Sequence, residues 1–150
     1  MDLILWRHAE AEDRAPDLER RLTPRGRKHA AQVAAWLLQR LPAKFLVLAS
    51  PALRAQETAQ ALGVPVRTLE QLAPGASVAQ ILGAAEWPRH KSAVVVVGHQ
   101  PDLGSVAAFL VCGSAASWSV KKGGAWWLSN RALEDGGQVV VRAVVAPDLL

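Results

Sequence analysis

The stretch Leu3-Ile4-Leu5-Trp6-Arg7-His8 places four apolar residues directly before two basic ones. A short, continuous apolar run of this kind is typical of a strand that is buried on both faces. Such strands belong to parallel sheets covered by helices, in which ligands bind beyond the carboxyl ends of the strands. We therefore expect a strand over residues 3–6, with Arg7 and His8 at the edge of the sheet where a ligand would bind.

Two further apolar runs have the same form. Residues 45–49 and residues 93–97 are continuous apolar stretches, and polar or basic residues follow each of them. The carboxyl ends of parallel strands meet at one edge of a sheet, so the residues that follow the three runs are expected to lie together. The residues expected to converge on this crevice are Arg7, His8, Ser50, Arg54 and His99.

Segments that favour helices lie between the strands. In the first of them, Thr23 offers an N-cap and Pro24 suits the first helical position, and apolar residues follow at helical spacing. Further helices are expected to begin near Ala52, after Ser77 and at Asp102, with Ser77 and Asp102 as N-caps. The expected helices span residues 24–41, 52–62, 77–85 and 102–112.

Three weaker strands complete the expected sheet. Residues 64–68 form a short strand near an edge, because Pro65 cannot donate a hydrogen bond to a neighbouring strand. Residues 125–129 and 138–146 form two strands joined through residues 134–137, which is a hairpin-type ending. The alternation of strands and helices predicts an α/β fold with three α/β/α layers, a mostly parallel central sheet and an antiparallel C-terminal element.

The composition suits one domain and excludes several classes of protein. With 150 residues, 51% hydrophobic and 20% charged, the chain is expected to form a single domain over residues 1–150 rather than disorder, collagen or a coiled coil. The lone Cys112 excludes an intramolecular disulfide framework and a thiolate zinc site. No run approaches the about 20 apolar residues of a membrane span, and Asp2 and Arg7 interrupt a signal-like start. We therefore expect a cytoplasmic protein without a membrane partner.

Two histidines and two arginines at strand ends suit phosphoryl transfer. A neutral His8 imidazole can attack phosphorus and form a covalent phosphohistidine, which water then cleaves. Guanidinium groups bind phosphate oxygens in a planar fork, so Arg7 and Arg54 would share the equatorial oxygens with a protonated His99. Such a site requires no metal or other cofactor, and the sequence has no cluster of ligands at metal-binding spacing.

Four ordered motifs resemble those of the histidine phosphatase superfamily, which has a phosphoglycerate mutase-like fold. Arg7-His8-Ala9-Glu10 resembles the family's Arg-His-Gly signature and the acidic residue that follows it. The other motifs, in chain order, are Leu22-Thr23-Pro24-Arg25-Gly26, Ser50-Pro51-Ala52-Leu53-Arg54-Ala55-Gln56-Glu57-Thr58 and Gly98-His99. The short chain and the stretch from Arg20 to Gly26 are most similar to the SixA branch of compact phosphohistidine phosphatases.

The resemblance implies a role for each matching residue. His8 would be the nucleophile and His99 the second catalytic histidine, with Arg7 and Arg54 as phosphate-binding residues. Arg20 matches a basic position in the family's Arg-Pro-Leu-Thr stretch and is a further candidate for closing over the substrate. An arginine in a polar loop is usually only solvated, so both interpretations of Arg20 stay open.

The sequence departs from the family pattern at two positions. Ala9 replaces the usual glycine, which predicts a slightly narrower pocket. Gln71, with Glu70 beside it, stands where many members carry an acidic proton donor, so the general acid stays unassigned. An alkoxide leaving group needs such an acid, whereas imidazole, with a pKa of about 6.5, needs it less. The chain also leaves little sequence for an enclosing lid, and both points favour phosphohistidine on another protein as the substrate.

Two alternative functions stay open. One is a phosphomonoesterase of the same superfamily that acts on a small phosphorylated metabolite. The other is a non-catalytic phosphate-binding module, which the presence of His8 disfavours. His29 and His90 are interpreted as residues outside the site. Nucleic acid is not expected as a partner, because no nucleic-acid motif accompanies the net charge of +4 or the basic stretch from Arg20 to Lys28.

Overall fold

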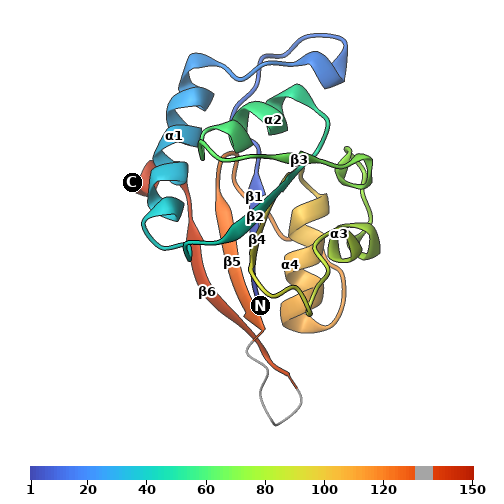
Figure 1. Cartoon of the computed structure of the whole chain (residues 1–150). Coiled ribbons are helices and arrows are strands. Elements are labelled where there is room, and N and C mark those ends of the chain that lie inside the picture. Colours follow the sequence, from blue (N-terminus) through green and yellow to red (C-terminus); the bar gives the residue numbers. More distant parts are fainter. Residues whose placement is uncertain (131–136) are drawn as a thin grey trace.

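A six-stranded sheet runs through the computed structural model, which describes residues 1–130 and 137–150 (Figure 1). Its strands are β1 (Asp2–Arg7), β2 (Phe45–Ala49), β3 (Arg67–Thr68), β4 (Ala93–Gly98), β5 (Ala125–Asn130) and β6 (Val139–Val145). They lie in the order β3-β2-β4-β1-β5-β6. The first four in this order pair in parallel, whereas β5 and β6 are antiparallel, which confirms the predicted sheet.

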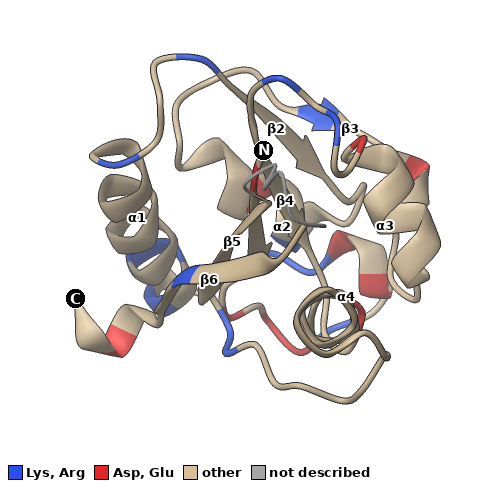
Figure 2. Ribbon diagram, turned by 90° about the horizontal axis from the view of Figure 1, so that it is seen from below, with Lys and Arg blue, Asp and Glu red and all other residues tan. Residues whose placement is uncertain are grey.

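The helices are α1 (Pro24–Leu38), α2 (Leu53–Gln60), α3 (Val78–Ala84) and α4 (Asp102–Cys112), with 3-10 turns η1 (Asp17–Glu19), η2 (Glu70–Leu72) and η3 (Pro147–Leu149). The helices cover both faces of the sheet, as the view in Figure 2 shows for α1 and α4. Alternate residues of β1 face the two layers: Ile4 packs in the core beneath α1 and α2, and Leu5 packs in the core beneath α3 and α4. The layers are therefore the expected α/β/α arrangement.

Two of the three predicted N-caps are present. The Thr23 hydroxyl accepts a hydrogen bond from the Gly26 N–H at 3.0 Å, and Ser77 forms a capping box with Gln80. The prediction for Asp102 was wrong, because Pro101 is the N-cap of α4 and makes no side-chain cap. The Asp102 carboxylate instead accepts a hydrogen bond from the Gly75 N–H at 2.9 Å and so fixes the loop before α3.

The structure also bears on the expected third strand, the C-terminal hairpin and membrane-spanning segments. β3 is shorter than predicted, because only Arg67 and Thr68 pair with β2. In the expected connection between β5 and β6, residues 134–136 lie outside the described residues. In the part of the chain that the structure describes, no helix is both long and apolar enough to cross a membrane.

The sheet register aligns the ends of its three central strands. Arg7 of β1 lies opposite Gly98 of β4, and Ala49 of β2 lies opposite Val97. Two backbone hydrogen bonds of 3.0 Å extend this alignment beyond the strands, one from the His8 N–H to Gly98 and one from the Ser50 N–H to Val97. The residues that follow the three strands are therefore held at one edge of the sheet.

Candidate active site

His8, Arg54 and His99 form a buried cluster at this edge, with only 8%, 5% and 4% of their surfaces exposed. The Nε atom of Arg54 lies 3.3 Å from Nε2 of His8, and an Nη atom of Arg54 lies 3.5 Å from Nδ1 of His99. The centroids of the two imidazole rings are 5.3 Å apart. One guanidinium group thus connects two histidines that come from different strand ends.

The hydrogen bonds of His8 determine which ring nitrogen is free to react. Nδ1 lies 2.8 Å from the Ala9 carbonyl oxygen, which can only accept, so Nδ1 carries the hydrogen. Nε2 then holds the lone pair and accepts from Arg54. Burial, followed by the positive charges of Arg54 and Arg7, lowers the pKa of His8 to about 4 despite the opposing bond to Ala9. His8 is therefore a neutral imidazole near pH 7, with its lone pair directed at a cation.

His99 is also neutral in this arrangement. Its Nε2 lies 2.8 Å from the Ser50 hydroxyl oxygen, which in turn accepts from the Ala52 N–H at 3.1 Å. Burial, and then the charges of His8 and Arg54, lower the pKa of His99 to about 3. The sequence predicts a protonated His99. Without a bound phosphoryl group, the burial and the nearby cations keep His99 neutral instead. A phosphoryl dianion beside the ring would raise this pKa.

Arg7 lies beside the cluster and keeps part of its hydrogen-bonding capacity unused. One Nη atom donates to the Val120 carbonyl at 2.8 Å. Its buried Nε–H has no partner among the described residues. Burial lowers the pKa of Arg7 from its ordinary high value, and its charge contributes to the lowered pKa values of both histidines. A buried N–H donor without a partner suits an oxyanion ligand.

An aspartate that was not predicted from the sequence completes the contacts of Arg54. Asp17, in η1, accepts from Arg54 through its carbonyl at 2.8 Å and through its carboxylate at 3.2 Å. Arg20 contacts the other carboxylate oxygen of Asp17 at 3.3 Å and donates to the Glu12 carbonyl at 2.7 Å. Arg20 therefore reaches the cluster through Asp17, and its described contacts do not include His8 or His99.

Helix α2 fixes the loop that follows His8. The Thr58 hydroxyl accepts from the Ala9 N–H at 3.0 Å and donates to the Arg54 carbonyl at 2.7 Å. Glu57 accepts from the Leu22 N–H at 2.9 Å. Ala9 is fully buried in the core beneath α1 and α2, so its methyl group packs there and not on an exposed pocket wall.

The position expected for an acid lies apart from the cluster. Glu70 and Gln71 are both exposed on η2, directly after β3. None of their described contacts involves His8, Arg54 or His99. Neither side chain is therefore placed as a proton donor, and Asp17 is the acidic side chain that the structure brings to Arg54.

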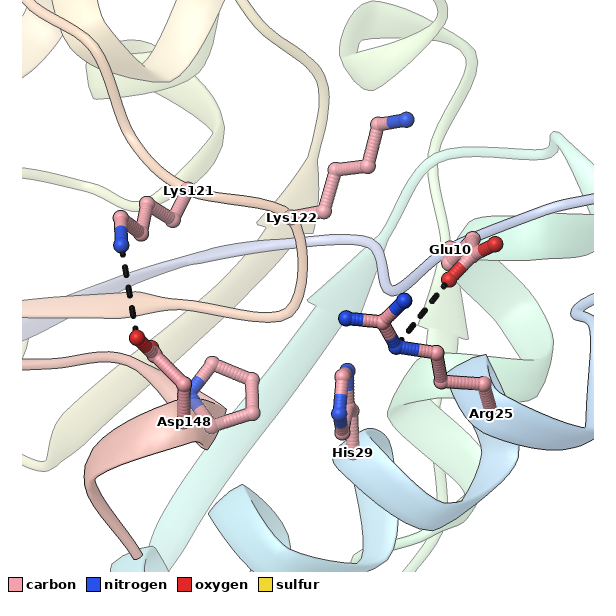
Figure 3. A pocket seen from close by; sticks show the side chains of 7 residues that line it. Glu10, Arg25, His29, Lys121, Lys122 and Asp148 are labelled. Carbon is pink, nitrogen blue, oxygen red and sulfur yellow. Dashed lines mark ion pairs between the residues drawn. The ribbon is translucent and has the colours of Figure 1, made fainter.

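A pocket outside the buried cluster is lined by one of the remaining histidines, His29 (Figure 3). It has a volume of about 460 Å³, and its lining includes Glu10, Arg25, His29, Lys121, Lys122 and Asp148. Two ion pairs span parts of it, Arg25 with Glu10 at 3.7 Å and Lys121 with Asp148 at 3.5 Å. His90 instead lies 3.7 Å from Glu86. Neither His29 nor His90 belongs to the buried cluster.

Comparison with known proteins identifies relatives of this chain. The sequence model of the histidine phosphatase superfamily (branch 1) matches residues 3–74. An uncharacterized protein of Picosynechococcus is 38% identical over 136 residues, which are 83% of this chain and 82% of that protein. The chain belongs to the histidine phosphatase superfamily. Membership confirms the expectation of a phosphatase, a hydrolase of phosphoryl groups.

Solved structures place this histidine phosphatase within the SixA type. A SixA structure from Nakamurella multipartitia is 32% identical, with a TM-score of 0.77, and the match covers 97% of this chain and 96% of that one. The protein histidine phosphatase SixA in complex with tungstate is 26% identical, with a TM-score of 0.83 and 99% of each chain covered. The predicted family, branch and fold are therefore confirmed.

Proposed function

We propose that this SixA-type chain is a phosphohistidine phosphatase that works through a covalent phosphoryl group on His8. The observation that carries the proposal is the 3.3 Å contact between His8 Nε2 and Arg54 Nε. This contact supports the proposal, because it sets a neutral imidazole beside a guanidinium that could hold phosphate, in a buried site where electrostatic interactions are strong. A phosphate-binding module would need the cation but not an unprotonated nucleophile beside it.

The chemistry follows from the atoms in the cluster. The lone pair of His8 Nε2 forms a bond to phosphorus while the bond from phosphorus to the leaving group breaks on the opposite side. Arg54 and Arg7 would hold the phosphoryl oxygens through their guanidinium groups. Water then attacks the same phosphorus, the electron pair of the P–N bond returns to Nε2, and the proton released by the water goes to the departing phosphate or to solvent. His99, whose ring Ser50 fixes, would donate to the oxygens once a bound phosphoryl dianion favours its protonated form.

Phosphohistidine on a protein is the substrate that the surroundings of the cluster favour. Glu70 and Gln71 are not placed to protonate an alkoxide, whereas an imidazole leaves more readily. Tungstate is a tetrahedral oxyanion like phosphate, and it is bound in the SixA structure that matches along 99% of this chain. Phosphatases for small molecules share the fold, including an α-ribazole-5'-phosphate phosphatase from Escherichia coli at 19% identity, so a small phosphorylated substrate is the second candidate.

The test compares kcat/KM for a phosphohistidine peptide with kcat/KM for glucose 6-phosphate. We expect a preference of about 100-fold or more for the peptide, because its leaving group needs no general acid. Equal values, or a preference for the sugar phosphate, would support the metabolite phosphatase. Binding of both without turnover would support the binding module. His90→Asn serves as the matched histidine control, since His90 lies outside the cluster.

A further inference from the structure

The carboxylate of Asp17 lies at the mouth of the buried cluster. Its side chain is 58% exposed, whereas that of Arg54, to which it is bonded, is 5% exposed. Asp17 is therefore the exposed partner of a buried guanidinium that also contacts both histidines. In-line attack by His8 sends the leaving group away from His8, and a leaving group that is part of a protein has to lie on the solvent side, where Asp17 is exposed.

Two arginines hold this carboxylate in place and keep it charged. Arg54 contacts one of its oxygens at 3.2 Å and Arg20 contacts the other at 3.3 Å. Partial desolvation acts to raise the pKa of Asp17, but the hydrogen bonds and charges of Arg54 and Arg20 outweigh it and lower the pKa overall. Asp17 is therefore an acceptor at neutral pH and not a proton donor.

The Nη atom that binds Asp17 also approaches His99 at 3.5 Å, and Nε of the same side chain is directed at His8. A phosphoryl group held by Arg54 and His8 would thus have the Asp17 carboxylate on the neighbouring side of the same guanidinium. This position suits contact with the leaving group of the substrate more than contact with the dianionic phosphoryl oxygens, which the carboxylate repels.

We propose that Asp17 selects phosphohistidine by accepting a hydrogen bond from the N–H of the leaving imidazole. The inference rests on the proposed function. When phosphorus is attached to one ring nitrogen, the other can carry a proton, and the ring is then an imidazolium that a carboxylate attracts. An alkoxide or a phenolate develops negative charge as it leaves, and the same carboxylate repels it.

The step balances without a general acid. His8 Nε2 forms the new P–N bond, and the P–N bond of the substrate breaks with its electron pair going to the departing ring nitrogen. The proton on the other nitrogen of that ring stays in place, hydrogen-bonded to Asp17, so the ring leaves as a neutral imidazole. This accounts for a SixA-type site in which Glu70 and Gln71 do not reach the reacting atoms.

The test is the variant Asp17→Asn, assayed with a phosphohistidine peptide and with p-nitrophenyl phosphate, whose leaving group departs as an anion. We expect kcat/KM for the peptide to fall about tenfold or more, because a charge-assisted hydrogen bond is lost. We expect kcat/KM for p-nitrophenyl phosphate to rise, because the repelling charge is gone. Asp17→Glu keeps the charge and should restore the preference for the peptide.

The matched control is Glu19→Gln, which removes an exposed carboxylate of the same 3-10 turn. Glu19 makes none of the described ion pairs, so its variant should keep the native ratio between the two substrates. The inference is overturned if Asp17→Asn leaves the peptide kcat/KM undiminished, or if both substrates slow equally, as a structural role for Asp17 requires. If the native chain turns over p-nitrophenyl phosphate but no phosphohistidine, the proposed function itself has failed.

Discussion

Nε of Arg54 lies 3.3 Å from Nε2 of His8, so the guanidinium meets the one ring nitrogen of His8 that bears a lone pair. Burial is the main reason that the pKa of His8 is low, and this contact adds to it, because a second positive charge beside Arg54 is unfavourable. The same contact places a phosphate-binding group where the new P–N bond would form. Both properties depend on the position of Arg54, which α2 and the backbone carbonyl of Asp17 hold.

The first prediction concerns the geometry of this guanidinium. Arg54→Lys keeps a positive charge but loses the planar fork that reaches His8, His99 and Asp17. We expect kcat/KM for a phosphohistidine peptide to fall about 100- to 1,000-fold, the usual loss when one oriented donor to a transition state is removed. Steady-state kinetics measures the change. Arg40→Lys is the control, since Arg40 is exposed and stacks on Trp36. Native-like activity of Arg54→Lys would show that charge alone suffices.

A second prediction links the two histidines to stability. In the unfolded chain histidine has a pKa of about 6.5, whereas the folded values are about 4 for His8 and about 3 for His99. Between these values the unfolded state binds more protons, so the free energy of unfolding falls as the pH is lowered from about 6.5 toward about 4. Urea unfolding of the native chain should therefore show this loss of stability.

The control for the pH series is the double variant His8→Asn, His99→Asn. It should show a smaller loss over the same pH range, because its site has no imidazole to protonate on unfolding. Asp102, whose pKa is raised by burial, is common to both proteins and cancels in the comparison. If the free energy of unfolding depended on pH equally in the two proteins, the lowered histidine pKa values would be contradicted.

A third prediction tests the close approach that supports the loop after His8. A Cβ atom at Gly26 would overlap the carbonyl oxygen of Glu10, a backbone atom that cannot move without shifting the loop. Gly26→Ala should lower the free energy of unfolding by about 1–3 kcal/mol, the usual cost of overpacking. Gly83→Ala, in α3, meets nothing within 4 Å and should raise it by about 0.5–1 kcal/mol. Urea unfolding of both variants measures the two changes in the free energy of unfolding. Equal changes would contradict the close approach of Gly26 to the Glu10 carbonyl.

A fourth prediction concerns metal ions. Positioning and charge stabilisation in the proposed reaction come from Arg7, Arg54 and the histidines, so no divalent ion is required. Dialysis against EDTA should leave kcat/KM for a phosphohistidine peptide unchanged within error, and added Mg²⁺ should not raise it. Loss of activity on chelation, with recovery on adding a divalent ion, would contradict the mechanism.

The sequence predicted the strands well where burial on both faces produced continuous apolar runs. β2 has the predicted bounds, Phe45–Ala49, and the residues after β1, β2 and β4 do lie together. Predictions from local sequence were wrong where a side chain forms its hydrogen bond with a residue that is distant in the sequence. Asp102 has the residue type of an N-cap, but its carboxylate binds the Gly75 N–H, which only the packing of α3 and α4 brings near.

The candidate site was predicted incompletely for the same reason. Asp17 lies in a polar loop 37 residues from Arg54, and nothing in that loop marks which of its acidic residues will meet the guanidinium. The signal that was available is the arginine itself, because a buried guanidinium requires acceptors. That signal predicts an acidic partner for Arg54, but it does not select Asp17 from the other acidic residues of the loop.

The covalent intermediate on His8 is the central claim, and a rapid-quench labelling experiment tests it most directly. The chain is mixed briefly with a ³²P-labelled phosphohistidine peptide, quenched in base and examined for bound label. The account predicts label that is acid-labile and base-stable, located on His8, absent from His8→Ala and retained in His90→Asn. Label that persists in His8→Ala, or native turnover with no label on His8 at any quench time, would contradict it.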